Sequence, residues 1–290
     1  MFINPKTDYA FKKIFGSSES KNILISFLNA LIYDANPIIE DLEIINPNLP
    51  PKILGLKDTY LDVKAKLNDG TLVIIEMQVL NVLSFDKRVL YNAAKTYAFQ
   101  LQSGEGYRML KPVIALTITD FEMFPEFQEY ISQFVYKEKT KNVTYTDGEL
   151  DLFFIELPKF HKSISQLETL TDKWIYFLKS ARSLTQVPAN MDNIPEIHHA
   201  FEIANEANLT REEIEDLERR EQFIYDQQGA IALGRQEGRQ EGRQEGLEQG
   251  MQEKAIEIAR QLLDRLDDET ISQTTGLSLE EVKSLRSNPA

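Results

Sequence analysis

The chain has 290 residues, 42% of them hydrophobic and 10% aromatic, enough for a large domain with or without an extension. It has no cysteine, no secretory leader pattern and no apolar run of about 18 residues. These features exclude disulfides and thiolate metal sites, and they predict a cytoplasmic protein without a membrane partner.

The net charge of −14 lies mostly in the second half of the chain. Residues 1–150 carry 16 Lys and Arg against 19 Asp and Glu, whereas residues 151–290 carry 16 against 27. A locally basic groove for nucleic acid in the first half is therefore compatible with the acidic total.

The order of predicted elements indicates an α/β core. Apolar spacing predicts helices over 7–16 and 18–33, the second with Ser18 as its N-cap. The next elements are expected to be strands over 37–45, 61–67 and 72–79, a helix over 85–104 and a buried strand over 111–119. Further strand candidates at 129–139 and 150–160 precede an amphipathic helix over 163–182. From about Ile197 the chain is expected to be helical throughout.

The hairpin at 61–78 carries one carboxylate in each arm, in the sequence LDVKAKLNDGTLVIIEMQ. Because side chains alternate along a strand, Asp62 shares a face with Lys64 and Lys66, while Leu61 belongs to the opposite, apolar face with Val63, Ala65 and Leu67. A three-residue loop with Gly70 in the left-handed conformation matches the faces and places Asp62 opposite Glu76. A slip of two residues, with Lys64 opposite Glu76, stays open.

Two opposed carboxylates repel each other unless they share a proton or a cation. Mg²⁺ takes oxygen ligands and is often held by one or two carboxylates together with substrate phosphate. The pair Asp62 and Glu76 therefore indicates half of a metal site, and Lys64, Lys66 and Gln78 on the same face could contact phosphate or water. The alternative is an ordinary exposed hairpin face with a Lys64–Glu76 ion pair.

Asp62 followed after thirteen residues by Glu76-Met77-Gln78 resembles the motif of the PD-(D/E)XK nuclease superfamily. Three further segments make the chain similar to the bacterial Rpn branch, the recombination-promoting nucleases: PKTDYAFKKIFG (5–16), DKRVLYNAAKTYAFQLQSGEGYRMLKPVIALTITDF (86–121) and the glycine-repeat tail. The resemblance implies a restriction-endonuclease-like core, with a mixed sheet flanked by helices, followed by an all-helical C-terminal tail.

The resemblance also implies roles for individual residues. Asp62 and Glu76 would hold Mg²⁺, for which Mn²⁺ can substitute, together with the backbone carbonyl of Met77. Gln78 stands where the superfamily usually has lysine. A glutamine can orient water but carries no charge, so Lys64 or Lys12 would have to supply one, and Gln78→Lys is expected to keep or raise activity.

Other residues are candidates for contacts at the same site. Asp8 matches an acid of the family's first helix, although it also fits an ordinary helix N-cap. Lys12, Lys66 and Arg88 are candidates for contacts with substrate phosphate.

A glycine recurs every fourth residue in the tail, at positions 234, 238, 242, 246 and 250. Each glycine inside a helix costs about 0.8–1.0 kcal/mol relative to alanine, so an isolated helix should not carry five of them. A second helix packed against the glycine stripe would offset this cost, and the segment is therefore expected to form a homo-oligomer. A flexible linker is the alternative.

The last stretch, DDETISQTTGLSLEEVKSLR (267–286), resembles the start of a helix-turn-helix. Its few basic residues favour a small capping helical hairpin over a DNA reader. The predicted organisation is thus a nuclease-like domain (1–185), a helical extension (186–230), the glycine-repeat segment (231–252) and a helical hairpin (253–290).

The function that these features predict is a Mg²⁺-dependent endonuclease acting on double-stranded DNA in recombination, transposition or defence against foreign DNA. Gln78 and the acidic total favour an alternative of another class. In that alternative the chain is a catalytically weak, oligomerising interaction or regulatory protein that has kept the nuclease fold.

Overall fold

A mixed six-stranded sheet forms the centre of the first part of the chain, in the order β1-β4-β5-β6-β8-β7. The structure is a computed structural model that describes residues 1–49, 59–145 and 148–287. The strands of this sheet are β1 (Leu42–Ile45), β4 (Val63–Leu67), β5 (Leu72–Gln78), β6 (Val113–Thr119), β7 (Ile131–Phe134) and β8 (Leu150–Glu156). Strands β5, β6 and β8 are mutually parallel, and the other neighbours are antiparallel. A separate two-stranded sheet joins β2 (Asn48–Leu49) to β3 (Thr59–Tyr60).

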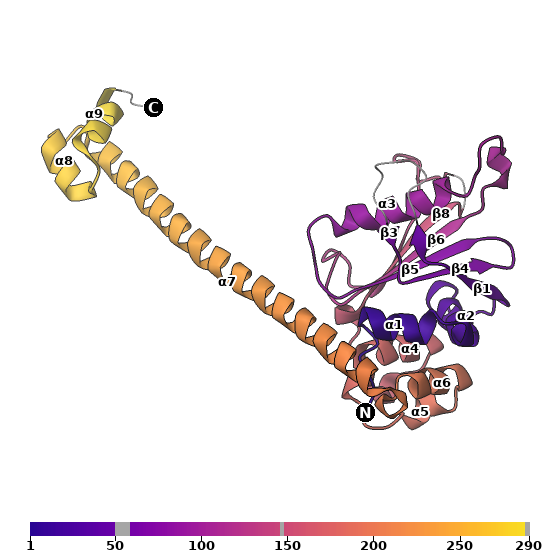
Figure 1. The fold of residues 1–290 in the computed structure, drawn as a ribbon. Coiled ribbons are helices and arrows are strands. Elements are labelled where there is room, and N and C mark those ends of the chain that lie inside the picture. Colours follow the sequence, from indigo (N-terminus) through magenta and orange to yellow (C-terminus); the bar gives the residue numbers. More distant parts are fainter. Residues whose placement is uncertain (50–58, 146–147, 288–290) are drawn as a thin grey trace. The chain divides into compact units, whose positions relative to one another are not determined.

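Helices cover both faces of the sheet, which confirms the predicted fold class. Figure 1 shows α3 (Phe85–Ala98) on one face and α1 (Asp8–Phe15), α2 (Lys21–Ile32) and α4 (Leu170–Ser180) on the other. The chain continues through α5 (Ala189–Asp192), α6 (Pro195–Ile203), α7 (Arg211–Leu262), α8 (Asp268–Thr275) and α9 (Leu279–Ser287). It divides into two compact units, Met1–Tyr225 and Asp226–Ala290.

The main core lies between the sheet and the helices of its second face. Trp174 on α4 is fully buried, and its ring centre lies 5.9 Å from that of Phe15, 5.6 Å from Phe27 and 5.8 Å from Phe177. Its indole N–H donates to Oγ of Ser26 at 3.2 Å, so the polar end of the buried ring is satisfied.

Three predicted boundaries were wrong by several residues. Ser18 lies in a short 3₁₀ turn, and α2 begins only at Lys21. Helix α3 ends at Ala98 rather than near Gly104, which instead occupies a turn with a φ of 93°. The stretch 37–45 is strand only from Leu42 onward.

The hairpin register agrees with the three-residue loop. Val63 pairs with Ile75 and Lys64 with Ile74, which rules out the slip that would place Lys64 opposite Glu76. Gly70 has a φ of 93°, and the Gly70 amide donates to the Leu67 carbonyl at 2.9 Å. Glycine adopts this backbone region without a steric penalty, so the turn fixes the register.

The assignment of Leu61 to the face of Val63 was wrong. Leu61 packs with Ile74, Ala93 and Ala115 on the α3 side of the sheet, whereas Val63 faces the main core. The chain therefore changes direction at Asp62, and the two-residue alternation does not extend through that position.

Helix α7 is continuous from Arg211 to Leu262 and contains the glycine repeat. A methyl group added at any of the five repeat glycines would meet no atom within 4 Å in the described part of the chain. Within one chain the stripe is therefore unpacked.

The end of α7 packs with α8 and α9 around a small core of Ala259, Ile271, Leu277 and Val282. Gly276 joins α8 to α9 with a φ of 77°. No helix within the three described ranges is both long enough and apolar enough to cross a membrane.

Candidate active site

Asp62 lies where the pairing of β4 with β5 ends. In continuous antiparallel pairing, Leu61 would lie opposite Met77 and exchange backbone hydrogen bonds with it. Instead the Leu61 amide donates to the carbonyl of Pro47 at 3.2 Å, and the Met77 amide donates to Oδ2 of Asp62 at 2.7 Å. The Asp62 carboxylate thus replaces a backbone acceptor, and the sheet fixes its position.

Glu76 faces α3 and takes its partners from that helix. Nδ2 of Asn92 donates to Oε1 of Glu76 at 2.5 Å, and Nε of Arg88 lies 3.8 Å from Oε2. Arg88 and Asn92 are four residues apart, so both reach the sheet from one face of α3. Oδ1 of Asn92 is buried and has no hydrogen-bond partner among the described residues.

Burial raises the pKa of both carboxyl groups. The Asp62 side chain is only 16% exposed, and burial together with the nearby Asp8 raises its pKa to about 7, against the opposing Met77 amide and Lys12. The pKa of Glu76 is also raised by burial, which the Asn92 hydrogen bond and the Arg88 charge only partly offset. A cation supplied from outside would relieve the cost of ionising either group.

Asp8 lies beside Asp62 and is not the N-cap of α1. Thr7 caps the helix, since its hydroxyl accepts from the Ala10 amide. Lys12 Nζ lies 2.6 Å from Oδ1 of Asp8 and 3.5 Å from Oδ1 of Asp62, so it bridges the two carboxylates. Burial opposes ionisation of Asp8, but its contacts with Asp62, Lys12 and Arg220 outweigh burial and lower its pKa.

The nitrogen and the oxygen of the Gln78 side-chain amide both form hydrogen bonds. Its Nε2 donates to the Leu80 carbonyl at 2.6 Å, and its Oε1 accepts a short hydrogen bond from Arg88. Arg88 also stacks over the Phe85 ring, 4.8 Å from its centre. Gln78 therefore orients Arg88 beside Glu76, a role that needs an acceptor.

Lys64 and Lys66 lie farther along β4 from Asp62. Lys64 is half-buried, and desolvation lowers its pKa. Lys66 pairs with Leu72 and lies opposite Glu43 of β1. Four residues of strand span about 13 Å, so Lys66 stands at the other end of the strand from Asp62.

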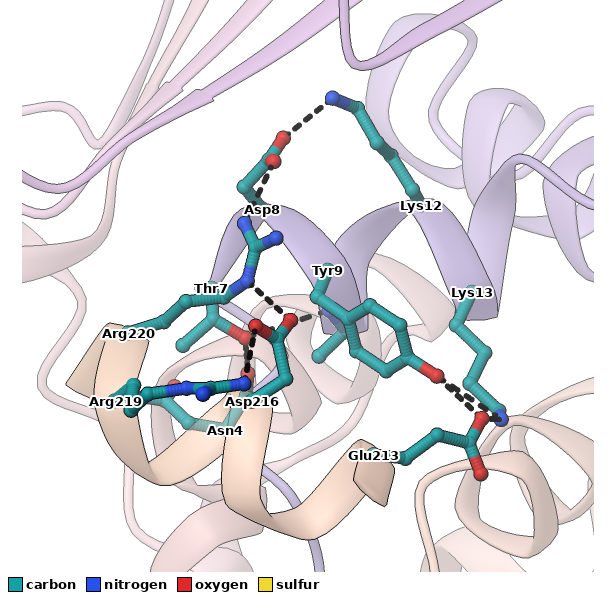
Figure 2. A network of polar contacts seen from close by, with 11 residues as sticks. Asn4, Thr7, Asp8, Tyr9, Lys12, Lys13, Glu213, Asp216, Arg219 and Arg220 are labelled. Atoms are coloured by element: carbon teal, nitrogen blue, oxygen red, sulfur yellow. Dashed lines mark hydrogen bonds and ion pairs between the residues drawn. The ribbon is translucent and has the colours of Figure 1, made fainter. Parts of the chain in front are cut away.

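The first turns of α7 attach to α1 beside the site, as Figure 2 shows. Oε1 of Glu213 accepts from Nζ of Lys13 at 2.5 Å and also accepts a short hydrogen bond from the Tyr9 hydroxyl. Two turns of α7 further on, Nη1 of Arg220 lies 3.3 Å from Oδ2 of Asp8. Residues more than 200 positions apart in sequence thus meet at the candidate site.

Glu213→Gln is expected to weaken the attachment of α7 in a pH-dependent way. Hydrogen bonds from Lys13, Tyr9 and the Thr210 amide lower the pKa of Glu213 to about 2. Since the folded pKa is depressed, the stabilisation is present above the unfolded pKa of about 4.3 and is lost as the pH falls toward 2. Urea unfolding should give a deficit of about 1–2 kcal/mol for the variant at pH 7 and a smaller one at pH 3.

The matched control is Glu212→Gln, which changes an exposed neighbour on α7. It should match the parental chain at both pH values. A deficit in Glu213→Gln that does not change with pH would contradict the role of the ionised carboxylate.

The donor set fits a hard divalent cation. Asp62 and Glu76 offer carboxylate oxygens, Met77 offers a backbone carbonyl, and the buried Oδ1 of Asn92 is an unused oxygen acceptor beside Glu76. No group of three His, Cys, Asp or Glu that could hold a metal occurs among the described residues. A cation bound here would therefore keep water or substrate oxygens in its shell, as Mg²⁺ usually does.

Sequence reasoning missed Asn92 and Arg220. The spacing of Arg88 and Asn92 on one face of α3 could have indicated Asn92 as a partner of the sheet acids. Arg220 gave no such signal, because its contact with Asp8 depends on how α7 packs against α1.

Two family models match the chain. Residues 5–234 match the one described as a PD-(D/E)XK nuclease family transposase, which spans the sheet, its helices and the start of α7. Residues 252–287 match the C-terminal HTH domain of the Rpn/YhgA-like nuclease family. The second match favours a helix-turn-helix domain, rather than a capping hairpin, for the last three helical segments. Neither a curated protein nor a solved structure matches significantly.

Proposed function

Because the chain belongs to the PD-(D/E)XK nuclease family of transposases, in its Rpn branch, we propose that it is a Mg²⁺-dependent DNA endonuclease. It would hydrolyse phosphodiester bonds of double-stranded DNA in the cytoplasm, during recombination, transposition or defence against foreign DNA. The helix-turn-helix domain supports DNA as the partner.

The observation that carries the proposal is the pair of buried acids on the β4–β5 hairpin, with Asp62 directly before β4 and Glu76 within β5. Asp62 and Glu76 are 16% and 11% exposed, and both would ionise more readily beside a cation. Together with the Met77 carbonyl they would hold Mg²⁺, and Mn²⁺ can replace it. When bound, the metal activates water and stabilises charge on the phosphate.

The remaining side chains would arrange the substrate around these acids. Arg88 is 43% exposed and Lys12 40% exposed, so both can reach a phosphate while touching Glu76 and Asp62 respectively. Gln78 would hold Arg88 in place and orient water. Lys64, which has no ion pair among the described residues, would add positive charge, and Lys66 would contact phosphate farther along the duplex.

A plasmid-nicking assay tests the proposal. Supercoiled plasmid should be converted to nicked and linear forms with Mg²⁺ or Mn²⁺ but not with EDTA, and a single-stranded substrate should be cut less. Persistence of supercoiled plasmid at high enzyme and metal concentrations would favour the alternative of a catalytically weak interaction protein.

Gln78→Lys is expected to lower activity, which revises the expectation from sequence alone. Lysine can donate to the Leu80 carbonyl but cannot accept the Arg88 hydrogen bond, and it brings like charges together. The nicking rate should fall about tenfold, or about 1.4 kcal/mol. In an Arg88→Ala background, Gln78→Lys should lower the nicking rate much less. A rate for Gln78→Lys at or above the parental value would contradict this role of Gln78.

Homo-oligomerisation through the glycine repeat is part of the proposal. All five repeat glycines face open space in the described chain, although each costs about 0.8–1.0 kcal/mol in a helix. A second α7 packed on the stripe would offset this cost through close backbone approach. Two linked active sites would also favour cutting both strands of a duplex.

Replacing the five glycines with alanine is expected to weaken the oligomer. Added methyl groups would separate packed helices, whereas a lone helix would gain about 0.8–1.0 kcal/mol of helix propensity per site. Light scattering should show a dimer or larger species for the parental chain and a smaller mass for the variant. A parental monomer whose variant gains only helicity by circular dichroism would identify the segment as a linker.

A further inference from the structure

Each oxygen of the Asp8 carboxylate is held by a cation from a different helix. Oδ1 contacts Lys12 of α1 at 2.6 Å, and Oδ2 contacts Arg220 of α7 at 3.3 Å. The Asp8 side chain is 50% exposed, so little packing restricts its rotamer. The two cations, which Figure 2 shows, and the neighbouring Asp62 therefore determine where this carboxylate points.

The guanidinium of Arg220 is itself fixed before it reaches Asp8. Its Nε donates to Oδ2 of Asp216 at 2.7 Å, one turn earlier on α7. The Glu213 contacts with α1 and the burial of Leu217 attach this part of α7 to the domain. Arg220 thus presents its Nη1 to Asp8 from a rigid support.

Lys12 connects Asp8 to the candidate metal ligand. It lies close to Asp8, at 2.6 Å, and farther from Asp62, at 3.5 Å. If Asp8 turned toward solvent, Asp62 would remain as the only carboxylate partner of Lys12 among the described residues. The ammonium group would then compete with a divalent cation for the Asp62 oxygens.

We propose that Arg220 is a positioning residue of the active site: it holds Asp8, so that Asp8 keeps Lys12 from closing onto Asp62. The inference rests on the proposed function, since it assigns Asp62 to the metal. It makes the beginning of α7 a functional part of the catalytic unit, although Arg220 itself touches neither metal nor scissile phosphate.

The direction in which removal of Arg220 changes cation affinity separates a positioning role from simple electrostatics. Removing a positive charge near a cation site should strengthen cation binding if only Coulomb's law acts. Removing Arg220 should instead weaken binding if Asp8 is released and Lys12 moves onto Asp62. Loss of a group that orients a metal site typically costs about 10–100-fold in metal affinity.

The experiment measures Mn²⁺ affinity by calorimetry without DNA, on the full chain and on Arg220→Ala, Arg220→Lys, Asp8→Asn and the double variant Asp8→Asn/Arg220→Ala. Arg220→Ala should bind Mn²⁺ about tenfold more weakly, and Arg220→Lys should recover part of the loss. In the Asp8→Asn background Arg220→Ala should have no further effect, because Arg220 acts through Asp8. The nicking kcat should fall in parallel, with KM for plasmid little changed.

Arg219→Ala is the matched control. Arg219 contacts the same Asp216, at 3.5 Å, and its side chain is 72% exposed. It should keep parental Mn²⁺ affinity, while circular dichroism verifies that all variants are folded. The proposal is overturned if Arg220→Ala binds Mn²⁺ as tightly as the parental chain or more tightly, or if Arg219→Ala loses as much Mn²⁺ affinity. It is also overturned if the losses of affinity from Asp8→Asn and Arg220→Ala add in the double variant.

Failure of the proposed function gives a different result. A parental chain that binds Mn²⁺ but leaves DNA intact contradicts only the endonuclease, and calorimetry still decides the role of Arg220. A parental chain that binds no Mn²⁺ overturns both proposals.

Discussion

Asp62→Asn is expected to reduce Mg²⁺-dependent nicking at least about a thousandfold, because metal catalysis supplies several kcal/mol and each 1.36 kcal/mol is a factor of ten. Asparagine can still accept the Met77 amide hydrogen bond that the carboxylate accepts at 2.7 Å. The sheet should therefore keep its geometry while the charge that would bind the cation is lost. Glu76→Gln should have an effect of similar size.

Stability should change in the opposite direction to activity in this variant. Burial raises the folded-state pKa of Asp62 to about 7, above an unfolded value of about 3.9. The folded chain then binds the proton more tightly, so this residue's contribution to stability decreases as the pH rises from about 4 to 7. Asp62→Asn removes this pH-dependent loss of stability. The variant should therefore unfold at an equal or higher urea concentration at pH 8.

Nicking rate and urea midpoint at pH 8 are the measurements, and Glu43→Gln on the same sheet is the control. Glu43 is exposed on β1, and its substitution should leave both quantities unchanged. Parental activity in Asp62→Asn would show that the metal site lies elsewhere.

A chain ending at Thr185 is expected not to fold, whereas a chain ending at Ile231 should keep the six-stranded sheet and its helices folded. The ring of Phe201 on α6 lies 4.9 Å from that of Phe2 and 4.8 Å from that of Phe177. Loss of one buried phenylalanine side chain costs about 3–5 kcal/mol, and the shorter chain also loses the buried Ile197 and Leu217. The summed loss of stability approaches the whole free energy of unfolding of a domain, which is about 5–15 kcal/mol.

Trp174 provides the measurement, since it is the single tryptophan and is fully buried. Its fluorescence should report a cooperative transition for the chain ending at Ile231 and a solvated indole for the chain ending at Thr185. A cooperative transition in the shorter chain would show that residues 1–185 fold independently of α6 and α7.

The hairpin could be predicted from sequence because local rules determine it. The alternation of apolar residues and the single glycine at position 70 fix the register, which the structure follows as far as the pair Val63 and Ile75. The same rule failed at Leu61, because the competing partner Pro47 draws the backbone away from the ladder. The assignment of Asp62 to the metal stays a prediction, and its hydrogen bond to the Met77 amide was not foreseen.

Contacts between distant segments explain why the sequence left the role of Asp8 open. The N-cap interpretation of Asp8 used only its neighbours in sequence. Its partner Asp62 directly precedes β4, and its partner Arg220 lies on a helix more than 200 residues away.

The end of α3 was placed too late because a glycine was taken as the stop signal. Residues 99–103 leave the helix earlier, and Gln100 hydrogen-bonds to the backbone of Lys111 instead.

The open glycine stripe also makes α7 unevenly resistant to local unfolding. Five glycines lower the helix propensity of the segment by about 4–5 kcal/mol in sum, and no side chain of the described chain packs over them. In a monomer, the amides between Gly234 and Gly250 should therefore exchange with solvent faster than those near Leu217 or Ala259, which are buried at either end. Transient opening would then begin in the middle of the helix, so the sheet domain and the C-terminal helical core would each stay folded while the helix between them breaks and reforms.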